Sequence, residues 1–396
     1  MSEQNLEQIL NSKNYTEAGK LISEGAKLSR GLQEHQKTQI FDNLFREKQY
    51  EILNMMAKDK TIETDVYELD SFDKSIFQGL IRNLGNDEDD IQFFNHFISH
   101  FDNLNDEVAA TTLLGYFFER GASIGKIKVL TDAGCNINFK NNAEESFIHQ
   151  VIKTNLMKPE LSVSYLELLI SEGLDVNATD IVQKTPLITA VEFNRKEYLD
   201  LLLENGANPN DLDKNGNSAF FYAVAHKMDL ELYNKLREYA NPDFDVLNKD
   251  GVSLLFEYMR MFYSSEKGLE LFRKLLDDGG DLYQTNRHYS RETTPLDLIA
   301  EKSVAILETA LNAGKIDVNQ RDSLGNTLLH KVCAYNVNYE AEKAKETYRK
   351  VKLLLENGAD ISLTNDQDKT ALMLASDDNL KIKTVELLMK QSQNLI

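Results

Sequence analysis

The stretch from Asp180 to Asn210 reads as one small structural unit. Thr185 can cap the first amides of a helix that Pro186 opens, because the first helical position has an amide without a partner. A second, leucine-rich helix ends at Gly206, where glycine suits the left-handed residue that stops a helix. Two helices this short cannot bury their own apolar faces, so the unit predicts copies stacked beside it.

Such copies occur along the chain. The position of Thr185 recurs in phase with a second position that ends the unit's second helix. The first position falls at Ser146, Thr185, Ser218, Ser253, Thr294, Thr327 and Thr370. The second position falls at Gly173, Gly206, Tyr239, Gly280, Gly314 and Gly358. This two-anchor pattern resembles the ankyrin repeat, whose period is about 33 residues. The resemblance implies an all-α, ankyrin-type solenoid of helical hairpins.

Residues 1–106 carry apolar helix pairs without the turn motif. If Ile40, Phe77, Leu113 and Phe147 are equivalent positions, these pairs repeat at nearly the same interval as the later units. We therefore expect about eleven repeats, of which the first four are degenerate. The expected division is a divergent helical N-terminal region of degenerate ankyrin-like repeats over 1–106 and an ankyrin repeat array over 107–396. The alternative is that residues 1–106 form a separate helical domain.

Net charge restricts the class of partner. The chain of 396 residues has a net charge of −20. An acidic surface repels phosphate backbones and anionic lipid, and no apolar run approaches the roughly 20 residues that span a bilayer. We therefore expect a basic protein as the partner, and neither nucleic acid nor membrane, because an acidic body speeds encounter with basic molecules. Alternatively, the excess carboxylates only keep a long solenoid soluble.

The cellular compartment is indicated by two features. The N-terminal sequence MSEQNLEQIL lacks a basic start followed by an apolar core, so no secretory signal is expected. Cys135 and Cys333 are far apart in a linear array, so we expect two small buried thiols and no disulfide. We therefore expect a cytoplasmic protein that is monomeric when it is not bound to its partner.

Candidate catalytic and metal-binding residues are few. His96 and His100 stand four residues apart on an expected helix, but no third ligand is evident. His149 and His330 take the fourth place of the Thr-Pro-Leu-His motif, where the resemblance implies a hydrogen-bonding role within the repeat. The sequence has no glycine-rich phosphate loop and no nucleophile elbow. We expect no catalytic residue, no cofactor and no metal.

The resemblance also predicts a binding surface. In ankyrin repeat proteins, partners contact the turn tips and the exposed end of the first helix, on the concave side. Carried onto this sequence, the protein-binding residues are Ile181, Val182, Lys184, Glu192, Phe193, Lys214, Asn215, Asn217, His226, Asp250, Arg260, Met261, Leu324, Tyr335, Asp377 and Asp378. The apolar members on an acidic rim are typical of interface anchors. The alternative is that each folds onto a neighbouring repeat.

Three repeats are longer than the others. Their extra residues, around Lys153–Ser164, Met259–Gly268 and Ala334–Lys350, are expected between the two helices of each unit. Insertions that share one face of a solenoid often form its binding face. The alternative is that longer helices extend the packing.

These features favour a non-catalytic protein-binding function. We expect the chain to sequester or inhibit a basic protein, for example as a cytoplasmic antidote or immunity protein that covers a toxin. The alternatives are a scaffold or secreted effector that recruits other proteins and, third, an enzyme with its site in residues 1–106. Fold resemblance does not name the partner.

Overall fold

A computed structural model describes residues 6–29, 31–154, 158–289 and 291–393. Residues 1–5, which are part of the segment expected to lack a signal, and residues 155–157 of the first expected insertion lie outside this description. The chain forms two compact units, Met1–Ala207 (unit 1) and Asn208–Ile396 (unit 2). The boundary expected between residues 106 and 107 stays a prediction.

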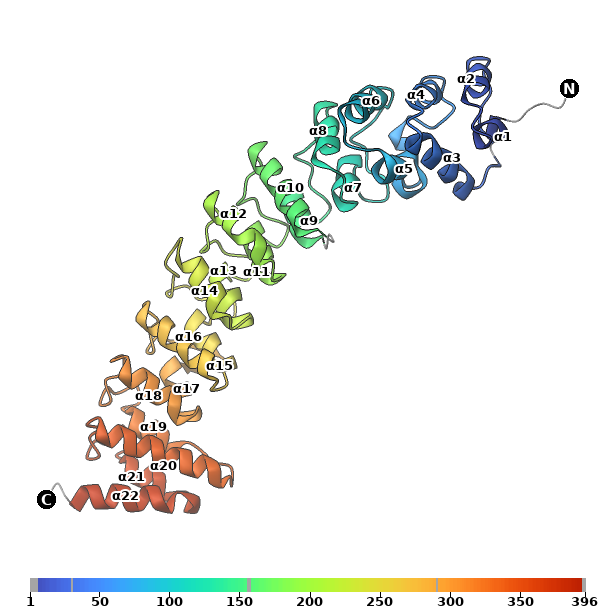
Figure 1. The fold of residues 1–396 in the computed structure, drawn as a ribbon. Coiled ribbons are helices and arrows are strands. Elements are labelled where there is room, and N and C mark those ends of the chain that lie inside the picture. Colours follow the sequence, from blue (N-terminus) through green and yellow to red (C-terminus); the bar gives the residue numbers. More distant parts are fainter. Residues whose placement is uncertain (1–5, 30, 155–157, 290, 394–396) are drawn as a thin grey trace. The chain divides into compact units, whose positions relative to one another are not determined.

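Unit 1 consists of six helical hairpins, drawn from blue to green in Figure 1. Its helices are α1 (Leu6–Asn11), α2 (Tyr15–Ser23), α3 (Glu34–Arg46), α4 (Tyr50–Lys58), α5 (Ile76–Asn83), α6 (Glu88–Ile98), α7 (Leu113–Glu119), α8 (Ile124–Asp132), α9 (Phe147–Lys153), α10 (Pro159–Ser171), α11 (Pro186–Glu192) and α12 (Leu199–Glu204). Short 3-10 turns at Val66–Glu68, Phe72–Lys74 and Lys196–Tyr198 complete the unit.

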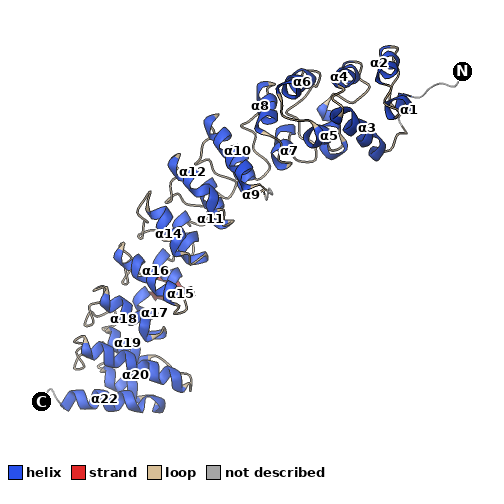
Figure 2. Ribbon diagram, viewed as in Figure 1, coloured by secondary structure: helices blue, strands red, loops and turns tan. Residues whose placement is uncertain are grey.

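Unit 2 consists of five further hairpins and one small strand pair. Its elements are α13 (Ala219–Phe221, continued by a π-helical turn at Tyr222–His226), α14 (Leu230–Arg237), α15 (Leu254–Met261), α16 (Glu266–Asp277), β1 (Asn286–His288), β2 (Arg291–Thr293), α17 (Pro295–Glu301), α18 (Val304–Asn312), α19 (Leu328–Ala334), α20 (Ala341–Glu356), α21 (Ala371–Ser376), a 3-10 turn at Asn379–Lys381 and α22 (Ile382–Gln393). Figure 2 shows how fully helices dominate.

The hairpins stack in the same way within each unit. First helices contact first helices, as in α3 with α5 and α19 with α21, and second helices contact second helices, as in α6 with α8 and α16 with α18. The expected all-α solenoid of about eleven helical hairpins is therefore confirmed. The first four hairpins pack like the others although they lack the turn motif.

Local signals in the sequence act as expected. The Thr185 hydroxyl accepts a hydrogen bond from the Ile188 amide at 3.3 Å, and Pro186 occupies the first position of α11. Gly206 has φ +89°, and the next amide, that of Ala207, donates to the Leu202 carbonyl at 3.0 Å. These contacts satisfy backbone groups that each short helix leaves without partners at its ends.

Four lysines, three of them buried and Lys302 partly exposed, tie neighbouring hairpins together. Lys126, Lys302, Lys350 and Lys381 each donate from Nζ to backbone carbonyls at the C-terminal end of the preceding hairpin's first helix, at 2.5 to 3.3 Å. A helix C-terminus carries partial negative charge and unpaired carbonyls, so a cation there satisfies both. Burial lowers the pKa of Lys126 and of Lys350 to about 8, which leaves both amines mainly charged at neutral pH.

One expectation about the long repeats needs correction. Most of the extra residues in the long repeats are not between helices: α10, α16 and α20 have 13, 12 and 16 residues, whereas α12 has 6. In α20, Ala344, Thr347 and Val351 are buried at helical spacing, which explains why this segment joins the helix.

Candidate protein-binding surface

Six five-residue turns connect the hairpins and have one common structure. Each begins with Asp or Asn, whose side-chain Oδ1 accepts from the amides two and four residues later at 2.8 to 3.2 Å. The turns are 141–145, 180–184, 213–217, 248–252, 322–326 and 365–369. An Asp or Asn side chain can accept hydrogen bonds from amides that follow it in the chain and so stabilise a turn. Each of these turns is therefore held in shape by its own first residue.

Neighbouring turns within a unit are also joined to one another. The amide of Ile181 donates to the Ala143 carbonyl, that of Lys249 to Asn215, and that of Asp366 to Leu324, at 2.9 to 3.1 Å. The middle residues of each turn are left with their side chains outward. The turns therefore present a row of side chains on a rigid backbone, which favours binding.

Two histidines join a first helix to the following turn. His149 Nε2 lies 3.0 Å from the Lys184 carbonyl, and His330 Nε2 lies 3.2 Å from the Lys369 carbonyl. A carbonyl only accepts, so Nε2 carries the proton, and Nδ1 accepts from the hydroxyl of Ser146 or of Thr327. Burial lowers the pKa of both imidazoles. The expected hydrogen-bonding role of His149 and His330 within the repeat is confirmed.

Gly325 is the turn glycine with the least room around it. It has φ +74°, and an added Cβ would lie 2.4 Å from Asp366 Oδ1 and 2.9 Å from the Asp366 amide nitrogen. Gly358 has φ +84° but nothing within 4 Å of an added Cβ. We expect Gly325→Ala to lower the free energy of unfolding of the last two hairpins by about 2 kcal/mol, and Gly358→Ala by only about 1 kcal/mol. Equal losses in urea denaturation would contradict the close approach of the two turns.

The residues predicted from the resemblance occupy three kinds of position. Ile181, Val182, Lys214, Asn215, Asp250 and Leu324 are exposed at the centres of turns. Lys184 and Asn217 close their turns; Lys184 also forms an ion pair with Glu192 at 2.7 Å, and Asn217 is only 8% exposed. Glu192, Phe193, His226, Arg260, Met261, Tyr335, Asp377 and Asp378 lie at or just beyond the ends of first helices. Their assignment to binding stays a prediction.

Apolar side chains are exposed on this surface in both units. In unit 1, Ile181, Val182 and Phe193 are exposed by 55%, 40% and 47%, and Lys153 Nζ lies 5.7 Å from the Phe193 ring centre. In unit 2, Leu324 is exposed by 64%, whereas Tyr335 is half-buried near the Lys350 ammonium. The alternative that these groups fold onto a neighbouring repeat therefore describes Tyr335 better than Leu324.

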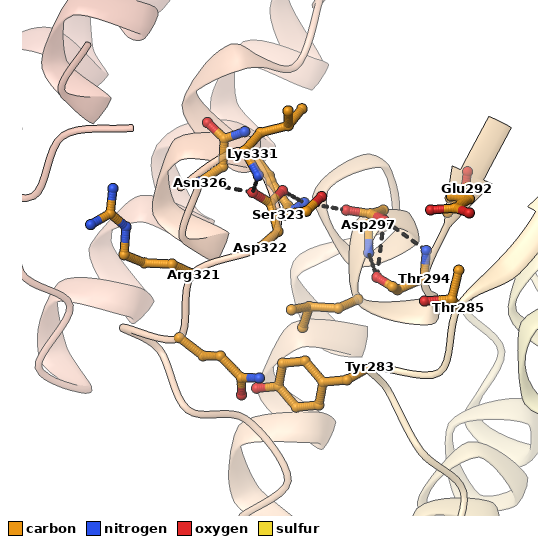
Figure 3. Close-up of a pocket in the computed structure, with 14 residues that line it drawn as sticks. Tyr283, Thr285, Glu292, Thr294, Asp297, Arg321, Asp322, Ser323, Asn326 and Lys331 are labelled. Carbon is orange, nitrogen blue, oxygen red and sulfur yellow. Dashed lines mark hydrogen bonds and ion pairs between the residues drawn. The ribbon is translucent and has the colours of Figure 1, made fainter. Parts of the chain in front are cut away.

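The central hollow of unit 2 has a volume of about 550 Å³ and is drawn in Figure 3. Lys331 Nζ lies 2.5 Å from Asp297 Oδ1 and also pairs with Asp322. Burial would lower the pKa of the Lys331 ammonium, but its bonds to the two carboxylates raise it. These three charges satisfy one another, which is typical of a structural joint between hairpins.

The finger hollow, of about 380 Å³, lies beside the β1–β2 pair, which we call the finger (residues 286–289 and 291–293). Four predicted residues meet there: Asn217, His226, Asp250 and Arg260. The finger contributes Arg287, His288 and Tyr289, which the resemblance did not predict. The available signal was the long interval from Ser253 to Thr294, which contains the basic segment NRHYSR.

The terminal hollow, of about 670 Å³, lies at the last two hairpins. It brings the predicted residues Asp377 and Asp378 together with Tyr339 and Leu380. Tyr339 is 98% exposed, and Asn338 and Tyr339 both have positive φ, at 49° and 63°. Two such non-glycine residues in succession are uncommon, and Ala109 and Ala110 form another such pair.

Candidate metal and membrane features were compared with the structure. The rings of His96 and His100 lie 5.0 Å apart, and the described ranges hold no group of three or more residues able to bind a metal ion. Within the same residues, no helix combines the length and apolar character needed to cross a bilayer.

Cys135 and Cys333 are both buried and free, as expected, and burial raises the pKa of each thiol to about 12.

Comparison with known proteins gives matches to ankyrin repeat sequences. A family model described as three copies of the ankyrin repeat matches residues 119–213 and 160–250. Mouse "Ankyrin repeat and SOCS box protein 6" is 30% identical over 132 residues, which cover 30% of this chain and 30% of that protein. "Ankyrin repeat protein OPG189" of variola virus is 24% identical over 262 residues, 57% of this chain and 44% of that protein. The matched parts thus span less than half of these relatives.

Among solved structures, the chain matches the ankyrin repeat domain of Bcl-3, which is described as a member of the IkappaB protein family. The two are 23% identical with a TM-score of 0.48, and the match covers 61% of this chain and 98% of that one. Ankyrin repeats form a protein-interaction fold that is generally without enzymatic activity. The stacked hairpins, the shared turn structure and the matched family model identify this chain as an ankyrin repeat protein.

Proposed function

We propose that this protein binds a basic partner protein through the turns and first helices of unit 2 and thereby sequesters or inhibits it. A cytoplasmic antidote or immunity protein that covers a toxin fits this role. The partner's chemistry is inferred from charge, because the chain carries 64 Asp and Glu against 44 Lys and Arg. Such an excess attracts cationic molecules and speeds their encounter.

The observation that carries the proposal is the terminal hollow. Asp377 and Asp378 lie beside the ring of Tyr339, which is almost fully exposed. The Asp377 side chain is exposed by 73%, and its only ion pair among the described residues is a 4.0 Å contact with Lys369. A partner lysine or arginine could contact carboxylates and an aromatic face together, a favourable combination for a cation.

The proposal predicts a specific loss of affinity. In Asp377→Asn/Asp378→Asn, we expect the partner captured from source-cell extract to bind about tenfold more weakly at low salt, since each charge contact contributes up to about 1 kcal/mol. The measurement is isothermal titration calorimetry with the purified partner. Rising salt should reduce the difference in affinity between the variant and the unchanged protein, because screening weakens exposed ion pairs.

The matched control is Glu270→Gln/Glu308→Gln. These residues are exposed on the second helices α16 and α18, so the variant removes the same two charges from another surface. We expect less than a twofold change for it. If both variants weaken binding equally, total charge attracts the partner and the terminal hollow does not.

A further inference from the structure

The region around the finger hollow contains more cations than anions, whereas the hollow's own lining is balanced, with Asp250 and Glu257 against Arg260 and Arg287. The region is formed by residues 212–228, 247–262 and 284–294, which contain the turns and first helices of two hairpins and the finger before the third. Their cations are Lys214, Lys227, Lys249, Arg260, Arg287 and Arg291, and their anions are Asp213, Asp250, Glu257 and Glu292. In a chain with a net charge of −20, this region has more cations than anions.

The finger is held firmly at its base. The amide of Arg287 donates to the Gly251 carbonyl at 2.9 Å, and Asn286 Oδ1 accepts from the Ser253 amide at 2.6 Å. Asn286 is 1% exposed, and the two strands pair in register from Asn286–Thr293 to His288–Arg291. The finger is thus anchored to the preceding turn by backbone and buried side-chain bonds.

The arginines of the finger are available to an anion. Arg260 forms an ion pair with Glu257, which is on its own helix. By contrast, the guanidinium groups of Arg287 and Arg291 have no carboxylate partner within the part of the chain that the structure describes, and both residues are exposed. A guanidinium presents donors that match a carboxylate in a two-bond arrangement.

Aromatic rings line the hollow next to these arginines. The His288 ring lies 5.6 Å from Phe256 and 4.3 Å from Tyr289, and the His226 ring lies 4.8 Å from Tyr222. Tyr289, with φ +48°, follows β1 and is 85% exposed. The hollow is therefore lined by aromatic rings as well as by polar and charged side chains.

We propose that the finger hollow binds an acidic segment of the partner protein, with a side-chain carboxylate on Arg287 and the adjoining residues against Tyr289. The inference rests on the proposed use of this surface for protein binding. Arg291 adds positive charge on the same finger. The finger hollow and the terminal hollow then attract opposite charges, so a partner with one acidic and one basic region fits in a single orientation.

The chain has no tryptophan, which allows a reporter at one position. Tyr289→Trp places the only indole at the finger, and Tyr67→Trp, at a residue 69% exposed in unit 1, provides the control position. At low salt, oligoglutamate is expected to shift the emission of Tyr289→Trp and to leave that of Tyr67→Trp unchanged. Oligoglutamine of the same length should shift neither.

Charge removal then tests the arginines. In the Tyr289→Trp protein, Arg287→Gln should raise the Kd for oligoglutamate about fivefold, and Arg287→Gln/Arg291→Gln at least tenfold. Arg273→Gln, on the second helix α16, is the control and should change the Kd by less than twofold. Circular dichroism melts of each variant establish that the fold is retained.

Three results would overturn the inference. They are an unchanged emission with oligoglutamate, an equal Kd in the Arg287→Gln/Arg291→Gln protein, and displacement of oligoglutamate by an equal concentration of inorganic phosphate, which would indicate a site for free anions. Oligolysine binding that requires Asp377 and Asp378 tests the proposed function separately. If oligolysine binds there and oligoglutamate does not bind the finger, only the present inference fails.

Discussion

Phe117→Ala is expected to lower the free energy of unfolding of unit 1 by about 4 kcal/mol. Phe117, on α7, is fully buried, and its ring centre lies 5.8 Å from that of Phe94 on α6 and 6.2 Å from that of Phe77 on α5. The ring therefore joins two consecutive hairpins. Alanine would remove its buried area and leave a cavity that rigid neighbouring helices fill only in part.

Hydrogen exchange can locate this effect. Because each hairpin depends on its neighbours, the amides of α5, α6 and α7 should exchange faster together, while those of α1 and α2 change little. Tyr67→Ala removes a ring that is 69% exposed and is the control, with an expected change below 0.5 kcal/mol. A loss confined to α7, or a loss as small as that of the control, would contradict the shared core.

Asp278→Ala is expected to lower the free energy of unfolding of unit 2 by about 3 kcal/mol. The Asp278 carboxylate follows α16 and accepts from Tyr233 Oη at 2.7 Å and from Arg237 at 3.2 Å, both on α14 of the preceding hairpin, and from Lys274 at 3.3 Å. Its side chain is 8% exposed. Alanine would leave the buried Tyr233 hydroxyl without its acceptor and the Arg237 cation without its counterion.

Asp277→Ala is the matched control, since Asp277 is the neighbouring residue and is exposed. It should cost less than 0.5 kcal/mol in urea denaturation. Burial would raise the pKa of Asp278, but its hydrogen bonds from Tyr233, Arg237 and Lys274 outweigh burial and lower it. The contribution of Asp278 is therefore complete above about pH 3.9, the value in an unfolded chain, and is lost as pH falls below that. Equal losses in the two variants would show that Asp278 does not join the hairpins.

Much of the fold could be predicted because each repeat carries its own local signals. Thr185, Pro186 and Gly206 start and stop helices through contacts with residues only a few positions away. Such contacts require nothing from the rest of the chain. The first four hairpins have fewer of these signals, and their apolar spacing alone predicted them.

Features that depend on contacts between repeats could not be predicted in the same way. A lysine on an amphipathic helix is expected at the surface, yet Lys350 is 2% exposed because the carbonyls of Ala300 and Lys302 lie within reach. The length of α20 likewise depends on contacts between repeats. Its buried residues gain their partners from α18 and α22, although the helical spacing of Ala344, Thr347 and Val351 was a signal within the segment itself.

The positions of the turns were predicted, but the charges around the finger were not. The turn centres at Ile181, Lys214 and Leu324 were correctly placed because the turn structure is local. The finger differs, since its arginines and Tyr289 come from a segment that departs from the repeat pattern. Residues can be carried over from a resemblance only where the repeat pattern matches. The excess of cations around the finger therefore became evident only from the structure.

We propose above that the turns and first helices of unit 2 bind a basic protein. The most direct test of this claim is hydrogen exchange of the full chain, alone and with the partner captured at low salt. We expect slower exchange in turns 213–217, 248–252, 322–326 and 365–369 and in the loop that contains Tyr339, with α14, α16 and α18 unchanged. Slower exchange in α14, α16 and α18 with no change in the turns would contradict the claim.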